Sequence, residues 1–319
     1  TLTGATTNCV KTVENTGTST RKIKVTGCTG NGVLNMSIAA NTAQDAVGNS
    51  SASATATAVT VDNAAPTLSI AVPTPNRINA SGTTSYIVTY ASADEITLSS
   101  DDITLTAAAG ITCDKTVNIY GSSSATIVLS NCTGNGTITR LDIAAGSAKD
   151  NAGNLAATVN RTSTVTIDNT APNIPTVALL VPASNAGGTP TPQLRITGIV
   201  SGDVLGLYTD SSCSAQVATG TASTTSLNLT TSSLAEGSYN FYVRSSDDLG
   251  NSTACANTGV SYTYAACTGS QRLVENTCAN PIIVTLGETT KDPKIYIAAS
   301  GSFTVELESN TAGVITQAT

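Results

Sequence analysis

Cysteines are the residues of this sequence with the clearest chemistry, and their spacing indicates disulfide bonds. Eight are present, at Cys9, Cys28, Cys113, Cys132, Cys213, Cys255, Cys267 and Cys278. The first two and the next two are each 19 positions apart, no Cys-x-x-Cys occurs, and the chain has no histidine. An even number of cysteines without zinc-ligand spacing is typical of disulfide-bonded secreted proteins. Sequence alone allows other connectivities, but we predict the economical set Cys9–Cys28, Cys113–Cys132, Cys213–Cys255 and Cys267–Cys278, and a location outside the cytoplasm.

Five aspartates occupy repeated positions where the chain turns. Asp45, Asp150 and Asp247 each begin a D-x-x-G-N segment, and Asp62 and Asp168 begin the segments DNAAP and DNTAP. Asp and Asn side chains commonly bond their own backbone in such turns. Alternatively, a D-x-x-G-N loop and the adjacent Asp could share a Ca²⁺, which takes about six to eight oxygen ligands. Two carboxylates per junction are few for such a site, and both interpretations stay open.

Acid–base catalysis finds little support in the remaining residues. The absence of histidine excludes Ser-His-Asp and Cys-His catalysis together with imidazole metal sites. Adjacent carboxylates at Asp94-Glu95 and Asp101-Asp102 are the type of pair that a glycosidase uses, but they lie in Ser-rich segments without an aromatic sugar platform. We therefore predict that the protein is not an enzyme and needs no cofactor, apart from the Ca²⁺ considered above.

Composition narrows the classes of partner. The net charge is −7, only 11% of the residues are charged, and basic clusters are absent, which argues against nucleic acid and anionic membrane surfaces. No run approaches the roughly 20 apolar residues that a membrane span needs. Aromatic residues make up 3% and tryptophan is absent, so small and β-branched residues carry the apolar content. Such residues pack well on pleated surfaces and favour thin β-layers.

An internal repeat relates distant segments of the chain. Cys9 and Cys28 recur at an offset of 104 as Cys113 and Cys132. The segment SIAANTAQDAVGN at 37–49 matches DIAAGSAKDNAGN at 142–154, and VTVDNAAP matches VTIDNTAP a little further on. A third, more diverged copy keeps DDLGN. Offsets that drift so little indicate copies of one domain with small loop insertions.

The elements that must position these residues are β-strands. Runs such as RKIKVTG, ATIVLSN, GTITRLDI and YIVTY have strand-like lengths and β-branched or alternating residues. The segment CTGNG occurs twice, and its Asn-Gly pairs, Asn31-Gly32 and Asn135-Gly136, predict hairpin tips. Many short strands in units of about 100 residues predict an all-β fold of tandem Ig-like sandwiches.

The ordered motifs GNGVLNMSIAANTAQDAVGN, VDNAAP and IDNTAP resemble the bacterial Ig-like repeats of large surface adhesins and fibres. The segment LAEGSYNFYVRSSDDLGN of the third copy is similar to a fibronectin-III-like ending, with Tyr239 at a tyrosine corner. The resemblance covers roughly residues 1–264 and implies a bacterial cell-surface location. Short Pro-containing linkers between the copies predict sandwiches arranged end to end as an elongated rod.

The predicted domains are incomplete at both ends of the sequence. We expect residues 1–62 to be the C-terminal half of an Ig-like domain, 63–168 a complete domain, 169–264 an Ig-like or FnIII-like domain, and 265–319 a disulfide loop followed by an N-terminal half. The halves are completed either by the rest of a longer array or by a neighbouring copy, as in strand-complemented pili, unless the chain is a self-contained monomer. The predicted function is a subunit of an extracellular bacterial fibre whose partners are other copies of itself. The alternative is the stalk of an adhesin that presents a tip to a cell-surface ligand.

Overall fold

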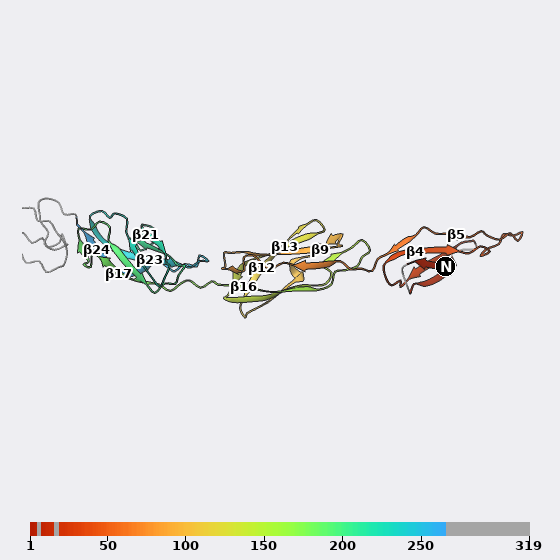
Figure 1. Ribbon diagram of the computed structural model, residues 1–319, viewed down its shortest axis with the longest axis horizontal. Coiled ribbons are helices and arrows are strands. Elements are labelled where there is room, and N and C mark those ends of the chain that lie inside the picture. The colour runs from red at the N-terminus through yellow and green to blue at the C-terminus, as the bar shows by residue number, and fades with distance from the viewer. Residues whose placement is uncertain (5–7, 16–18, 266–319) are drawn as a thin grey trace, which may run out of the picture. The chain divides into compact units, whose positions relative to one another are not determined.

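The computed structural model describes residues 1–4, 8–15 and 19–265, and strands dominate them (Figure 1). Contacts divide the chain into two compact units. The first contains Thr1–Pro172 together with Ser246–Thr253, and the described part of the second contains Asn173–Ser245 and the residues from Ala254 to 265. The predicted Cys267–Cys278 bond and the half domain at 281–319 lie outside the described residues.

The second repeat is a complete sandwich of two four-stranded sheets. The first sheet has the order β12-β13-β9-β7, with bounds β7 Thr67–Ile70, β9 Thr84–Ala91, β12 Thr112–Tyr120 and β13 Ser124–Thr133. The second has the order β11-β14-β16-β8, with bounds β8 Arg77–Ile78, β11 Ile103–Ala107, β14 Gly136–Ile143 and β16 Val159–Ile167. Short elements at the edges are β10 Glu95–Ile96, β15 Ala148–Lys149 and the 3-10 helix η1 Ser100–Asp102.

Alternation along the strands explains why these two sheets pack. On β9, Tyr86 and Val88 are fully buried, whereas Ile87 between them is 55% exposed. Successive side chains of a strand point to opposite faces, so this pattern places one face in the core. Ile127 on the same sheet and Ile138 on the opposite sheet are also fully buried. Tyr86 and Tyr90 fill core volume that small residues cannot fill. Burial raises the pKa of both hydroxyl groups, although the neighbouring Ser163 and Ser147 act to lower it.

The third repeat is a second sandwich with its own core. Its sheets have the orders β17-β19-β22 and β18-β24-β23-β20-β21. The bounds are β17 Thr176–Val181, β18 Ala186–Gly187, β19 Gln193–Thr197, β20 Val204–Tyr208, β21 Gln216–Thr221, β22 Ser226–Thr230, β23 Gly237–Ser246 and β24 Ala256–Tyr264. Phe241 and Tyr262 are fully buried, so the aromatic segments of this repeat supply core residues. The Tyr239 hydroxyl donates to the Ala235 carbonyl at 2.8 Å, the bond that a tyrosine corner requires.

The first repeat contains counterparts of only part of a sandwich. Its strands are β1 Leu2–Gly4, β2 Val10–Asn15, β3 Arg21–Thr26, β4 Gly32–Ile38, β5 Ala54–Thr55 and β6 Val59–Val61. β2 pairs with β3, as β12 pairs with β13 in the second repeat. β4 pairs with β1 on one side and with β5 and β6 on the other, as β14 pairs with β11 and β16. None of the described residues in 1–62 is buried. Ile38 and Val59 are 39% and 60% exposed, whereas their counterparts Ile143 and Val165 are fully buried.

The prediction of hairpin tips at Asn31-Gly32 and Asn135-Gly136 is wrong. β13 and β14, which flank the second of these pairs, belong to different sheets, and β3 and β4 are likewise not paired. A type I′ turn needs positive φ at both central residues. Here the glycines Gly134 and Gly136 have φ of +78° and +138°, but Asn135 between them does not lie in that region. The segment therefore carries the chain from one sheet to the other.

Candidate functional site

The D-x-x-G-N loops are closed by hydrogen bonds between their first and last residues. In the second repeat, the Asn154 backbone N–H donates to Asp150 Oδ1 and the Asn154 side-chain amide to Asp150 Oδ2, both at 2.8 Å. The pairs Asp45/Asn49 and Asp247/Asn251 repeat both bonds at 2.8–2.9 Å. Gly153 has a φ of +89°, a region that side chains rarely adopt, which explains the glycine before the asparagine.

These bonds determine the charge state of the loops. The hydrogen bonds from the Asn49 side chain and backbone hold the pKa of Asp45 below its usual value, and Asn154 lowers the pKa of Asp150 in the same way. Burial raises the pKa of Asp247, but the bonds from Asn251 outweigh it, so this pKa is also lowered. Hydrogen bonds to a carboxylate favour its charged form. The three loops therefore carry ionised aspartates over the whole neutral range.

The last asparagine of a loop also contacts a linker between repeats. The Asn154 side-chain amide donates to the Asp62 carbonyl at 3.0 Å, and that of Asn251 donates to the Asp168 carbonyl at 2.9 Å. The linker aspartates form short turns, because Asp62 Oδ1 accepts the Ala64 N–H at 2.9 Å. Asp168 Oδ1 accepts the Thr170 N–H at 3.1 Å in the same way. The repeated loop and the repeated linker are thus parts of one hydrogen-bonded junction.

The linker asparagine makes the remaining contacts of this junction with the CTGNG segment. The Asn169 side-chain amide donates to the carbonyls of Cys132 and Gly134 at 3.1 and 2.6 Å, and its backbone N–H donates to Asn135 Oδ1 at 2.6 Å. Asn63 makes the same three bonds to the first CTGNG segment, at 2.6–3.3 Å. Sequence reasoning missed this role, although the co-occurrence of CTGNG with a later Asp-Asn pair in both copies was a signal for it.

The loop at 246–253 makes additional contacts within the first compact unit. The Arg77 guanidinium forms an ion pair with Asp168 at 3.1 Å and a second one with Asp248. The Asn79 side-chain amide donates to the Leu249 carbonyl at 2.7 Å. Exposed ion pairs contribute little each, about 0–1 kcal/mol, to stability.

A calcium ion does not fit the described geometry of these junctions well. Both carboxylate oxygens of Asp45, Asp150 and Asp247 accept N–H groups, whose positive ends point to where a cation would bind. Asp62 and Asp168 each accept one N–H group from their own turn. In the part of the chain that the structure describes, no three acidic or cysteine side chains gather around one position. The predicted Ca²⁺ therefore remains a hypothesis.

Among the described residues there are three disulfide bonds, and they join the cysteines that the sequence-based set pairs there. Cys9–Cys28 and Cys113–Cys132 connect neighbouring antiparallel strands with Cα separations of 4.0 and 4.1 Å. Cys213–Cys255 joins residues 42 positions apart, with a Cα separation of 5.7 Å. Among the described residues no cysteine is free. The bonds therefore cross-link strands and loops, and none presents a reactive thiol.

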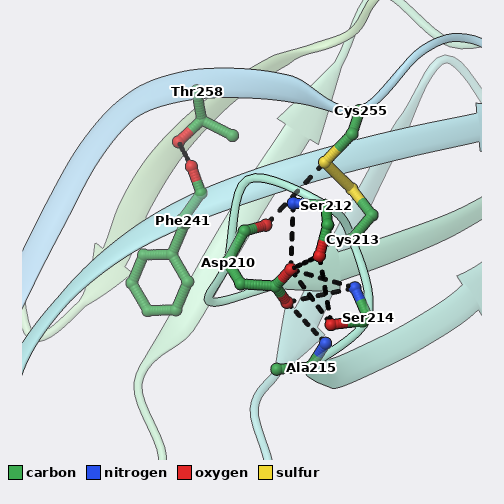
Figure 2. The surroundings of a disulfide bond; sticks show 8 residues. All are labelled: Asp210, Ser212, Cys213, Ser214, Ala215, Phe241, Cys255 and Thr258. Carbon is green, nitrogen blue, oxygen red and sulfur yellow. Dashed lines mark hydrogen bonds between the residues drawn. A yellow bond between two sulfur atoms is a disulfide. The ribbon is translucent and has the colours of Figure 1, made fainter.

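Figure 2 shows Asp210 enclosed by the turn that leads to the Cys213–Cys255 bond. Asp210 accepts the N–H groups of Ser212 and Ser214 at 2.9 and 3.0 Å, together with the Ser212 hydroxyl and the Ala215 N–H. These bonds, that from Ser212 first, hold the pKa of Asp210 far below its usual value. Sequence reasoning did not single out Asp210. Its role is to organise the turn, because its oxygens are directed at its own backbone.

The paired carboxylates considered for catalysis have local structural roles. Asp102 Oδ2 accepts the Ser99 N–H and hydroxyl at 2.8 Å and caps η1. Asp94 Oδ2 accepts the Asn151 N–H at 2.8 Å, and Glu95 forms an ion pair with Lys149 at 2.9 Å. The two pairs thus stabilise turns and edge strands of the second repeat.

The first repeat presents an open sheet edge with a charged outer face. β3 pairs with β2 on one side, while its counterpart β13 pairs with both β12 and β9. Lys22 and Lys24 are exposed on β3, and Ile23 and Val25 alternate with them on the half-exposed opposite face. An edge of this kind offers backbone hydrogen bonds to an added strand.

Comparisons with known proteins identify similar folds only. No protein-family model and no curated protein matches the chain. The Yersinia pseudotuberculosis adhesin InvE is similar at 14% identity and a TM-score of 0.23, over 62% of this chain and 58% of that protein. The Escherichia coli adhesin FdeC is similar at 21% identity and a TM-score of 0.25, over 64% of this chain and 65% of that protein. The extracellular region of plexin A4 is similar at 14% identity and a TM-score of 0.23, over 64% of this chain and 18% of that one.

The chain thus spans less than two thirds of each of these three proteins. Because the TM-scores are low, we draw no functional conclusion from the similarities. Within the described residues the helix η1 has three residues, and no helix there is long and apolar enough to cross a membrane.

Proposed function

We propose that the protein is a structural subunit of an extracellular bacterial surface fibre, in which the half domains at its two ends are completed by neighbouring copies. The single observation that carries this proposal is the uncovered core face of the first repeat. Ile38 and Val59 are exposed there, whereas the same positions of the second repeat are fully buried. An apolar face with unpaired edges is an aggregation hazard unless another segment covers it.

The other described features suit an array of domains that transmits mechanical force. Disulfides cross-link strands or loops within each repeat, and asparagine side chains bond loops to linkers. The carboxylates that could serve catalysis are engaged in turns. A head-to-tail contact that does not close on itself generates a filament, which is the assembly proposed here.

A concentration series of the purified chain tests this function. We expect electron microscopy and sedimentation velocity to show filaments that lengthen with concentration, and we expect a variant that ends at residue 280 to stay monomeric. If the chain from residue 1 to 319 stays monomeric at high concentration, with both ends folded, the proposal is contradicted.

A second candidate is the stalk of a surface adhesin. The observation that favours it is that the same junction occurs twice, first with Asn63 and Asn154 and again with Asn169 and Asn251. A stalk must join successive domains in such a defined way. In that case the segment that covers the first repeat comes from the same polypeptide. The purified chain would then remain monomeric at high concentration.

A further inference from the structure

We propose that residues 297–308 of a second copy add to the open edge of β3, with Glu306 directly opposite Lys22. This inference rests on the proposed fibre function and specifies which segment docks and in which register. It starts from the second repeat, where the strands that cover the core are present. There β13 pairs with β9 from Ser124↔Thr89 to Leu129↔Thr84, and β16 pairs with β8.

The open edges of the first repeat are the counterparts of these two pairing edges. In the described residues, β3 pairs only with β2, and β6 pairs only with β4. The first two repeats have the same pairing register in this hairpin. At the offset of 104, the pairs Val10↔Thr26 and Lys11↔Val25 correspond to Asp114↔Ser130 and Lys115↔Leu129. An added segment therefore needs the pattern of β8 and β9.

Residues 297–308 have that pattern in their sequence. IAASG at 297–301 matches INASG at 78–82, with four of the five residues identical. The glycine of this motif packs closely, because a Cβ on Gly82 would lie 3.1 Å from the Cβ of Ile78. Gly301 follows Ile297 by the same four positions, so the docked segment can make the same tight contact between strand and turn.

The following residues alternate as β9 does. In the second repeat, Thr84, Tyr86 and Val88 are buried, while Ile87 and Thr89 are exposed. Counting from the matched glycine, the buried positions are filled by Phe303, Val305 and Leu307, and the exposed positions by Glu306 and Glu308. The segment thus offers three large apolar side chains to a face that has no buried residue of its own.

Charge distinguishes this pairing from the one within the second repeat. The register Thr126↔Ile87 places Glu306 opposite Lys22, the counterpart of Thr126. Glu308 then lies diagonal to Lys22, and Lys24 lies diagonal to Glu306. Side chains directly opposite on neighbouring strands have Cβ atoms about 4.5–5.5 Å apart, close enough for opposite charges to attract.

Two further residues bear on the fit. Lys22 also faces Glu14 across β2, so it would be flanked by carboxylates on both sides. Arg21 occupies the position of the fully buried Ala125 at the end of the strand, where its long side chain must turn towards solvent. The second repeat lacks this charge pair, since the corresponding residues Ile87 and Thr126 are uncharged.

Charge exchange in the chain from residue 1 to 319 tests the register. Lys22→Glu and Glu306→Lys each replace an attraction by a repulsion, and we expect each variant alone to raise the concentration at the assembly midpoint about tenfold. An equimolar mixture of the two should assemble near the wild-type midpoint. The acidic edge of the first variant then meets the basic segment of the second, and the unchanged Lys22 edge of the second meets the unchanged Glu306 segment of the first. Rescue in the mixture also shows that both variants fold.

The control is Arg195→Glu, which makes the same charge change at an exposed position of β19 in a complete sandwich and should leave the midpoint unchanged. If both variants assemble like the wild type, this register is wrong while the fibre function stands. If the mixture fails but one chain carrying both exchanges recovers compact monomers, the segment closes on its own copy and the intermolecular inference is wrong. If the wild-type chain never assembles, the proposed function fails with it.

Discussion

At the scale of single residues, asparagine side chains connect one repeat to the next. Each junction asparagine uses an amide group to satisfy carbonyls of a separate segment, as Asn169 does with Cys132 and Gly134. The aspartates, which sequence reasoning emphasised, bond within their own turns. Removing a partner from a partly buried acceptor costs more than the net value of the hydrogen bond, because the acceptor has already lost its water.

Asn169→Ala tests this role. The change removes two donors to the CTGNG segment, and we expect it to destabilise the end of the second sandwich by about 1–2 kcal/mol. Hydrogen exchange in peptides from β13 and β14 measures the effect as a loss of protection. Asn118→Ala, at an exposed position of β12, serves as the control. Equal protection in both variants would show that the linker contact is not stabilising.

The lowered pKa of Asp150 predicts that the second sandwich becomes less stable at acid pH. Its pKa is lowered in the folded protein by Asn154, so the unfolded chain binds a proton first as the pH falls. The stabilisation is complete above the unfolded pKa of about 4 and is lost as the pH falls through the folded pKa. We expect the urea midpoint to decrease below about pH 4, and Asp150→Asn to make that decrease shallower.

Asp101→Asn, which removes an exposed carboxylate outside the D-x-x-G-N loops, is the comparison for this experiment. A pH profile of Asp150→Asn identical in shape to that of the wild type would contradict the assignment. The profile has to be measured on the second sandwich, by hydrogen exchange or by a local probe, because contacts divide the chain into more than one compact unit.

At the scale of elements, the sequence predicted the strands and the repeat but not how one turn crosses between sheets. Alternation around Ile127 and Ile138 shows that both flanking strands have an inward face. It does not show that the two faces belong to opposite sheets, and an Asn-Gly pair is common to hairpins and to other turns. The contacts of Asn63 and Asn169 escaped prediction because they join segments more than 30 residues apart. Only a repeated pair of motifs could have suggested them.

We expect the disulfides to contribute a large share of the free energy of unfolding of each repeat, because the cores contain few large side chains. Closing a loop of 19 or 42 residues stabilises by about 3 or 4 kcal/mol in the chain-entropy model. We expect Cys113→Ala/Cys132→Ala to lower the free energy of unfolding of the second sandwich by about 3 kcal/mol. Urea unfolding with and without a reductant measures this loss. Reductant should destabilise the wild-type sandwich and leave that of the double variant unchanged, and equal sensitivity of the two would contradict the prediction.

At the scale of the whole molecule, the described contacts give each complete repeat a separate core and a short bonded junction. Two core clusters are present among the described residues, one confined to residues 70–167 and the other to 177–262. Separate cores joined by brief linkers are the condition for an extended array, and the sequence-based prediction of a rod depends on it. The calcium hypothesis bears on the same question, because an ion at a junction would stiffen the array.

Solution scattering and thermal unfolding of the monomeric chain decide both points together. A rod of more than about 100 Å has a radius of gyration of about 30 Å, whereas a compact chain of this length has about 20 Å. We expect the larger value, and we expect neither it nor the unfolding midpoint to change between calcium and a chelator, since hydrogen bonds already occupy the junction carboxylates. A higher midpoint with calcium would establish a structural ion, because a ligand that binds only the folded state raises its stability. A value of about 20 Å in both conditions would show that the repeats do not extend.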